Sequence, residues 1–177
     1  MTVSASSRRD FLKASSLTLA GAALAAGTGI GRATHAAGND QIRVAVIGCG
    51  GRGAGAAANC LEADPAVKIV AIADTFQDRI DSALNLLQGK FGERVDVPAE
   101  RQFAGLDAYR QAIACDAQLV VLATPPGFRP AQYAAAVQAG KHVFMEKPLC
   151  VDAPGFRSLM ATNQRADDTG LKVVVGL

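Results

Sequence analysis

Two kinds of apolar pattern alternate along the chain from residue 42 onward. Short β-branched runs predict strands, and longer segments with apolar residues at helical spacing, such as Ile80, Leu84 and Leu87, predict helices. The expected strands cover residues 42–47, 68–73, 101–103, 119–123, 142–145 and 172–175. The expected helices cover residues 51–63, 76–88, 106–114, 129–139 and 153–168, and the polar stretch 89–100 is expected to form a loop.

This alternation predicts an α/β protein of the doubly wound, Rossmann type. Apolar strands joined by helices form a parallel sheet that is covered on both faces. Right-handed crossovers then favour the strand order 3-2-1-4-5-6. We expect residues 42–177 to form this domain, with the last strand, 172–175, buried. Because the sequence stops directly after that strand, we expect the chain to be the front part of a longer protein.

The first 36 residues have the pattern of an export signal. The run Ser7-Arg8-Arg9-Asp10-Phe11-Leu12-Lys13 is a twin-arginine motif, and a weakly apolar stretch follows over residues 14–30. Thr34-His35-Ala36 offers a cleavage site. A membrane anchor fits poorly, because the stretch is rich in Gly and Ala. The sequence predicts a signal peptide over 1–36, a linker over 37–41, and export by the twin-arginine translocase to the periplasm or another extracytoplasmic space.

Composition narrows the classes of function. The net charge is +2, and part of it comes from Arg8, Arg9 and Lys13, so no clustered basic face for nucleic acid is expected. The four cysteines match neither a zinc pattern nor a CxxC pair, and no metal site is expected. Thiols in the core or in loops are favoured over disulfides, because the apolar content suffices for a core. The cysteines are Cys49, Cys60, Cys115 and Cys150.

A glycine-rich segment directly follows the first expected strand and opens the first expected helix. Its sequence is Gly48-Cys49-Gly50-Gly51-Arg52-Gly53, which fits the G-x-G-x-x-G pattern of dinucleotide-binding proteins. The first glycine permits a tight turn, the second admits a pyrophosphate close to the backbone, and the third lets the helix lie close to the strand. The N–H groups at the helix start would face the phosphates. Arg52 is either a further cation for them or a solvated side chain.

An acid at the end of the second expected strand makes the glycine pattern more specific. Asp74 follows the run Ile69-Val70-Ala71-Ile72-Ala73, about 20 residues after the glycines, where Rossmann proteins bind the ribose hydroxyls. Its carboxylate would repel a 2′-phosphate, so NAD is expected rather than NADP. The competing interpretations are a plain tight turn for the glycines and a turn residue or helix cap for Asp74.

Two further strand ends carry distinctive residues. Thr124-Pro125-Pro126 follows the fourth strand, and Glu146-Lys147-Pro148 follows the fifth. Ligands of open α/β sheets lie beyond these carboxyl ends. We therefore expect Thr124, Pro125, Glu146 and Lys147 to join the cofactor site, with Lys147 as the catalytic candidate that polarises a hydroxyl or carbonyl near the nicotinamide. The alternative is an exposed ion pair that contributes little.

These motifs together resemble the Gfo/Idh/MocA oxidoreductases over residues 42–177. The resemblance rests on the glycine segment, on Ala123-Thr124-Pro125-Pro126, and on the run Ala139-Gly140-Lys141-His142-Val143-Phe144-Met145-Glu146-Lys147-Pro148. It implies that Lys147 contacts substrate and nicotinamide and that a cis peptide precedes Pro148. It also implies a second, substrate-binding domain, which we expect to follow residue 177 in a longer protein.

The sequence departs from the family pattern at two points. Gln132 stands where many members have a His, in the helix after the Thr-Pro loop. The family's catalytic His belongs to the second domain, and the only histidine here after signal removal is His142, for which we expect a place in the core. We therefore expect the chain to contain the cofactor-binding residues but not the catalytic His that exchanges the proton.

Three functions fit these residues. The first is the NAD-binding half of an exported oxidoreductase that transfers hydride from a sugar, polyol or related carbinol, and that forms a homo-oligomer at full length. The second is a glycosidase that retains and recycles a tightly bound NAD, which export favours. The third is a non-catalytic dinucleotide-binding module. Net consumption of NAD separates the first two, and a second domain with a catalytic His would exclude the third.

Overall fold

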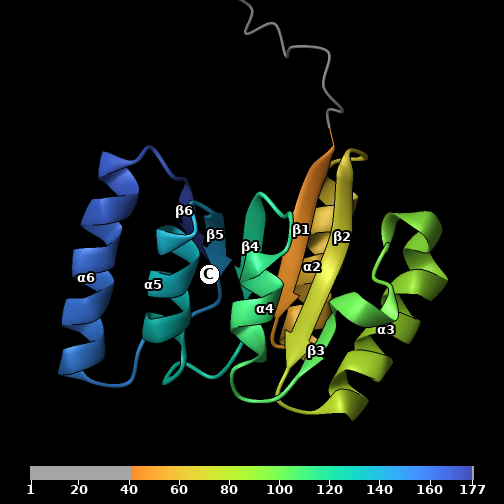
Figure 1. The fold of residues 1–177 in the computed structure, drawn as a ribbon, viewed down its shortest axis with the longest axis horizontal. Coiled ribbons are helices and arrows are strands. Elements are labelled where there is room, and N and C mark those ends of the chain that lie inside the picture. The colour runs from red at the N-terminus through yellow and green to blue at the C-terminus, as the bar shows by residue number, and fades with distance from the viewer. Residues whose placement is uncertain (1–40, 177) are drawn as a thin grey trace, which may run out of the picture. The chain divides into compact units, whose positions relative to one another are not determined.

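The computed structural model describes residues 41–176, so the expected signal peptide and most of the linker lie outside the described residues. Strands and helices alternate as predicted (Figure 1). The strands are β1 (Ile42–Ile47), β2 (Val67–Asp74), β3 (Gln102–Ala104), β4 (Leu119–Leu122), β5 (His142–Met145) and β6 (Val173–Val175). The helices are α2 (Gly51–Ala63), α3 (Gln77–Phe91), α4 (Ala108–Ala114), α5 (Arg129–Gln138) and α6 (Ala153–Asp168), with short 3-10 turns at Gly92–Arg94 and Ala99–Arg101.

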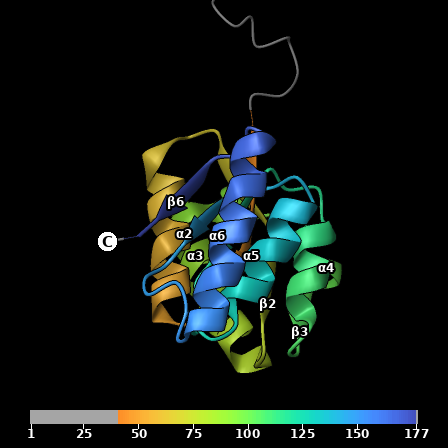
Figure 2. The same cartoon turned by 90° about the vertical axis from the view of Figure 1, so that its left-hand side faces the viewer.

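All neighbouring strands pair in parallel in the order β3-β2-β1-β4-β5-β6, which confirms the predicted topology. Helices α4, α5 and α6 cover one face of the sheet, and α2 and α3 lie on the other (Figure 2). The polypeptide enters β1 at the top of Figure 1, so every strand ends at the lower edge of the sheet. The loops that follow the strands therefore gather along one edge, where ligands of such sheets bind.

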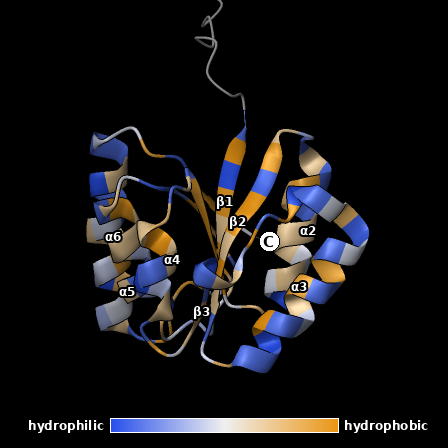
Figure 3. Cartoon of the chain, turned by 45° about the vertical axis from the view of Figure 1, so that its right-hand side comes forward, coloured by the Kyte–Doolittle hydropathy of each residue, from blue (hydrophilic) through white to orange (hydrophobic). Residues whose placement is uncertain are grey.

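Each face of the sheet has its own apolar core. Val44, Val46 and Ile69 face α2 and α3, whereas Ile47, Leu122 and Met145 face α4, α5 and α6. Successive residues of a strand point to opposite faces, and both faces are buried, so the central strands are apolar at almost every position. Figure 3 shows these apolar strands between helices whose outer faces are polar. No helix within residues 41–176 is long and apolar enough to cross a membrane.

Three sequence expectations need correction. The stretch 89–100 is more ordered than a loop, because α3 runs on to Phe91 and the buried Val95 and Val97 hold the two 3-10 turns against α3 and β2. The last strand is not fully buried: Val174 is 56% exposed. It lies at the edge of the sheet, and the described helices that cover β5 and β6 lie on the other face (Figure 2).

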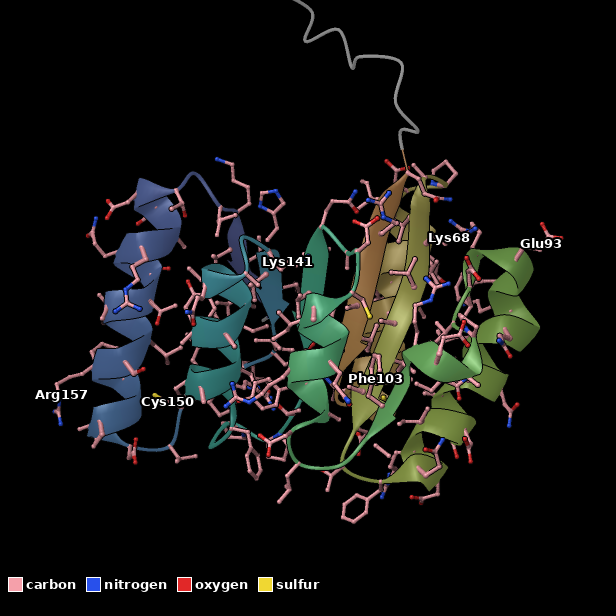
Figure 4. The ribbon with its side chains drawn as sticks, viewed as in Figure 1. Lys68, Glu93, Phe103, Lys141, Cys150 and Arg157 are labelled. Carbon is pink, nitrogen blue, oxygen red and sulfur yellow. The ribbon has the colours of Figure 1, made fainter. Side chains whose placement is uncertain are left out.

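His142 does not lie in the core as expected. It is the first residue of β5 and is exposed, and its Nδ1 accepts a hydrogen bond of 3.0 Å from the backbone N–H of Lys172. An apolar strand buries its middle, whereas a side chain at its first residue lies at the rim of the sheet. His142 also lies at the opposite edge of the sheet from the strand ends, next to Lys141, which Figure 4 labels.

Candidate dinucleotide site

The glycine segment forms a tight turn between β1 and α2. Gly48 has φ +93°, a conformation that side chains rarely adopt, and a Cβ there would lie 2.7 Å from the backbone of Ala123 and Thr124. A Cβ on Gly53 would lie 1.7 Å from the Gly48 carbonyl oxygen. The two expected roles, a tight turn and a close approach of helix to strand, are both confirmed by this geometry.

The middle of the turn is open. A Cβ on Gly50 or Gly51 would meet no atom within 4 Å. Gly50 caps α2 without a side-chain hydrogen bond, and the first turn of α2 contains no acid, so its N–H groups face outward without an acceptor from the helix. This end of the helix, where the dipole is positive, is suited to an anion.

Asp74 lies directly beside the turn. One carboxylate oxygen accepts the N–H of Cys49 at 2.6 Å, and the other accepts the N–H of Phe76 at 3.0 Å. These backbone donors fix the orientation of the carboxylate, which is half-buried and borders the cavity described below. The carboxylate oxygens retain lone pairs for hydroxyl donors.

Cys49 contributes its backbone to this arrangement, because its side chain is buried. The thiol lies 3.3 Å from the Ala73 carbonyl oxygen. Burial, and then the nearby charge of Asp74, raise the pKa of the Cys49 thiol well above its ordinary value. The sulfur is therefore a neutral packing group rather than a nucleophile. All four cysteines are free thiols, as the sequence analysis favoured.

The loops after β1, β2, β4 and β5 enclose a cavity of about 670 Å³. Eight of the predicted site residues border it: Gly48, Gly50, Arg52, Asp74, Thr124, Pro125, Glu146 and Lys147. The other three lie around the same turn, with Cys49 and Gly53 buried and Gly51 exposed. The sequence therefore identified residues that the fold brings together from four separate strand ends.

The Glu146-Lys147-Pro148 segment does not form the exposed ion pair of the alternative interpretation. Glu146 is 5% exposed, and its carboxylate pairs with Arg52 at 2.9 Å rather than with Lys147. Arg52 thus bridges α2 to the loop after β5. Lys147 is exposed and borders the cavity, and the peptide between Lys147 and Pro148 is cis, as the resemblance implied.

Several residues that border the cavity were not singled out from the sequence. Phe76, Leu106 and Phe128 are large apolar side chains that are more than half exposed at its rim. Each lies within a few residues of a strand's carboxyl end, so the rule that picked out Asp74 and Thr124 would also have found them. Two basic residues, Arg79 and Arg129, also border the cavity.

Gln132 occupies the position where many family members have a His. It is 6% exposed, borders the cavity, and accepts a hydrogen bond of 2.5 Å from the Thr124 hydroxyl through its side-chain oxygen. The amide therefore holds the Thr-Pro loop against α5. It cannot exchange protons as an imidazole does near neutral pH.

The fold and this turn define a Rossmann-type dinucleotide-binding domain. Comparison with known proteins specifies the family: residues 42–177 match the Gfo/Idh/MocA family, described as an oxidoreductase family with an NAD-binding Rossmann fold. The chain belongs to this family.

The similar proteins include a named glycosyl hydrolase and an inositol dehydrogenase. A protein named glycosyl hydrolase family 109 protein 2, from Shewanella sp. strain ANA-3, is 37% identical over 160 residues, which cover 80% of this chain and 33% of the relative. A scyllo-inositol dehydrogenase structure from Lactobacillus casei, with bound NAD(H) and scyllo-inositol, is 25% identical with a TM-score of 0.60 and covers 77% of this chain and 36% of that one.

A third comparison involves the other nicotinamide cofactor. A 3-ketoreductase from Actinomadura kijaniata, in complex with NADP and TDP-benzene, is 30% identical with a TM-score of 0.55, covering 77% of this chain and 37% of that one. This chain thus spans about a third of the length of the relatives it matches.

Proposed function

We propose that this chain is the NAD-binding part of an exported oxidoreductase that acts on a sugar, polyol or related carbinol. The observation that carries the proposal is the position of Lys147. Its side chain borders the same cavity as the glycine turn and Asp74. A proton-handling side chain and a dinucleotide grip within one cavity are what hydride transfer from a carbinol requires.

The residues present fit a dinucleotide. The open backbone at Gly50 and the uncapped start of α2 would hold the pyrophosphate. The oriented carboxylate of Asp74 would accept ribose hydroxyls and disfavour a 2′-phosphate, which supports NAD over NADP. Apolar side chains at the rim suit the faces of flat rings. Among the charged side chains that border the cavity, the exposed Arg52, Arg79 and Lys147 outnumber the acidic Asp74 and Glu146.

When bound, the nicotinamide would accept or supply the hydride. Lys147 would donate a hydrogen bond to the reacting oxygen of the substrate and stabilise charge that develops on it. Thr124 and Pro125 also line the cavity, and the hydrogen bond from the Thr124 hydroxyl to Gln132 holds this part of the lining in place. The proton acceptor for the hydroxyl is expected from the substrate domain that the family resemblance implies.

A second candidate function is a glycosidase that keeps and recycles its NAD. The glycosyl hydrolase names of the curated relatives favour this alternative.

We also propose export by the twin-arginine translocase, from the motif at Arg8 and Arg9, and a homo-oligomer at full length.

The balance of NAD distinguishes the two reactions. The full-length protein is incubated with excess NAD and a panel of sugars, polyols and aryl glycosides, while NADH absorbance and released aglycone are both recorded. The proposed dehydrogenase forms one NADH per carbinol oxidised and releases no aglycone. Aglycone release without net NADH would support the glycosidase. Neither product, with NADH still bound tightly, would leave a non-catalytic module.

A further inference from the structure

Arg129 is a buried cation in an unfavourable position. It is 4% exposed and is the first residue of α5, where the positive end of the helix dipole opposes a positive charge. Burial lowers the pKa of Arg129 from its ordinary value, against the opposing effect of the Glu146 carboxylate. Among residues 41–176, its Nε is the one buried side-chain nitrogen or oxygen without a hydrogen-bond partner. These features do not favour stability, and local rules are most often broken at functional sites.

The Arg129 guanidinium forms its hydrogen bonds with the loop after β5. Its Nη1 donates to the carbonyl oxygens of both Glu146 and Pro148, the two residues that flank Lys147. One nitrogen therefore joins both ends of the three-residue segment that presents the lysine. The planar, doubly donating guanidinium can do this, whereas a lysine ammonium on a flexible stem holds such a pair less rigidly.

The same segment is held from a second direction. The Glu146 carboxylate pairs at 2.9 Å with Arg52, from the first turn of α2. The backbone of the segment is thus tied to α5, and its acidic side chain is tied to the helix that begins at the glycine turn. Exposed Lys147 is the one member of the segment that is free to reach into the cavity.

We propose that Arg129 is a positioning residue that holds Lys147 over the bound dinucleotide, through the carbonyls of Glu146 and Pro148. The inference rests on the proposed function, because it assumes that a nicotinamide dinucleotide occupies the cavity. Arg129 itself acts on the loop, and the glycine turn and Asp74 hold the cofactor without it.

The test measures how NADH protects Lys147 from an amine-acylating reagent. The full-length protein is treated with an N-hydroxysuccinimide acetate with and without NADH, and acetylation of each lysine is followed by peptide mass spectrometry. At ten times the dissociation constant, NADH should slow acetylation of Lys147 by about tenfold in the native protein. Lys172, exposed at the opposite edge of the sheet, is the internal control and should be unaffected.

Arg129→Met removes both hydrogen bonds, and Arg129→Lys retains the positive charge without the planar guanidinium. Both variants should bind NADH with a dissociation constant within about twofold of the native value, measured by calorimetry. The glycine turn and Asp74, which hold the cofactor, are unchanged in both. Protection of Lys147 should be lost in Arg129→Met and reduced in Arg129→Lys. If Arg129→Met does not fold, Arg129→Lys carries the test. Arg157→Met, which changes an outward-pointing arginine of α6 (Figure 4), is the matched control and should behave as native.

The possible failures are distinct. Equal protection of Lys147 in the native protein and in the Arg129 variants would overturn the inference alone. Loss of NADH affinity together with protection would make Arg129 a structural residue of the whole cavity and would also overturn it. Failure of the native protein to bind NADH would overturn the proposed function, and the inference with it.

Discussion

Asp74 shows how a single residue gains its role from the backbone around it. The N–H groups of Cys49 and Phe76 hold its two carboxylate oxygens, so the side chain faces the cavity in one orientation. Its position after an apolar strand, about 20 residues beyond a glycine pattern, was readable from the sequence. Arg129 was not, because a lone arginine at a helix start has no local signature. Its partners lie on another loop, and only the fold brings them to it.

Replacing Asp74 tests the ribose contact. Asp74→Ala should weaken NAD binding by about tenfold or more, since hydrogen bonds to a charged group contribute roughly 1.5–3 kcal/mol. It should also reduce discrimination against NADP, because the repulsion of the 2′-phosphate disappears. Calorimetric titration with both cofactors measures the two effects. Asp116→Ala, at an exposed carboxylate paired with Arg43, is the control. An unchanged preference for NAD would remove Asp74 from the ribose site.

Replacing Lys147 tests the catalytic assignment. In the full-length protein, Lys147→Ala should lower turnover by roughly 10²–10⁴-fold, the usual contribution of a proton-handling side chain. NADH affinity should change little, because the turn and Asp74 provide the grip. Steady-state rates with the identified substrate, alongside NADH titration, separate the two. Lys172→Ala serves as the control, and native turnover in Lys147→Ala would leave Lys147 as a surface residue.

At the scale of elements, the alternation of strands and helices was predictable because apolar strands covered on both faces differ so clearly from amphipathic helices. Strand order followed from crossover handedness. The burial of the edge strand and of the segment after α3 was harder to predict. β6 has the composition of a buried strand, yet its place at the sheet edge leaves Val174 half exposed. The segment after α3 is polar overall, and two buried valines are enough to hold it against α3 and β2. Composition therefore predicts well that the middle of a strand is buried, but it does not predict which elements pack beside that strand.

The junction of β1 and α2 provides a test at this scale. Gly53→Ala places a methyl group 1.7 Å from the Gly48 carbonyl oxygen, so the helix must move away from the strand. The free energy of unfolding should fall by about 3 kcal/mol or more, at the upper end of overpacking effects. Urea denaturation of the whole chain measures it.

Gly55, two residues further along the same helix, is the matched control. A Cβ there meets nothing within 4 Å, so Gly55→Ala should stabilise α2 by about 0.5–1 kcal/mol. Equal stability of the Gly53→Ala and Gly55→Ala variants would show that α2 does not approach β1 as closely as described.

For the whole molecule, the domain within residues 41–176 brings a dinucleotide grip and a lysine to one edge of a sheet. The expected export signal precedes it in the sequence. The twin-arginine route carries folded proteins, and a cofactor loaded before export gives a reason to use it. The translocase recognises the signal itself, so the fold of residues 41–176 does not test the export assignment.

Export has its own test. Replacing Arg8 and Arg9 together by lysine should retain the full-length protein in the cytoplasm, because the translocase recognises the arginine pair. Fractionation of the producing cells, with an unrelated periplasmic protein as marker, gives the distribution. Unchanged export of the double variant would contradict the assignment of residues 1–36.

The central claim is that the turn at Gly48–Gly53 holds a nicotinamide dinucleotide. Gly50→Ala tests it most directly, since the added methyl group points into open space and leaves the fold intact, yet occupies the room that a pyrophosphate needs. Calorimetric titration of NADH into the native protein should show saturable binding. Gly50→Ala should lose about fivefold to 150-fold in affinity, as about 1–3 kcal/mol of overpacking implies, and Gly55→Ala should lose none. Equal NADH affinity in all three proteins, or no binding to the native one, would contradict the account.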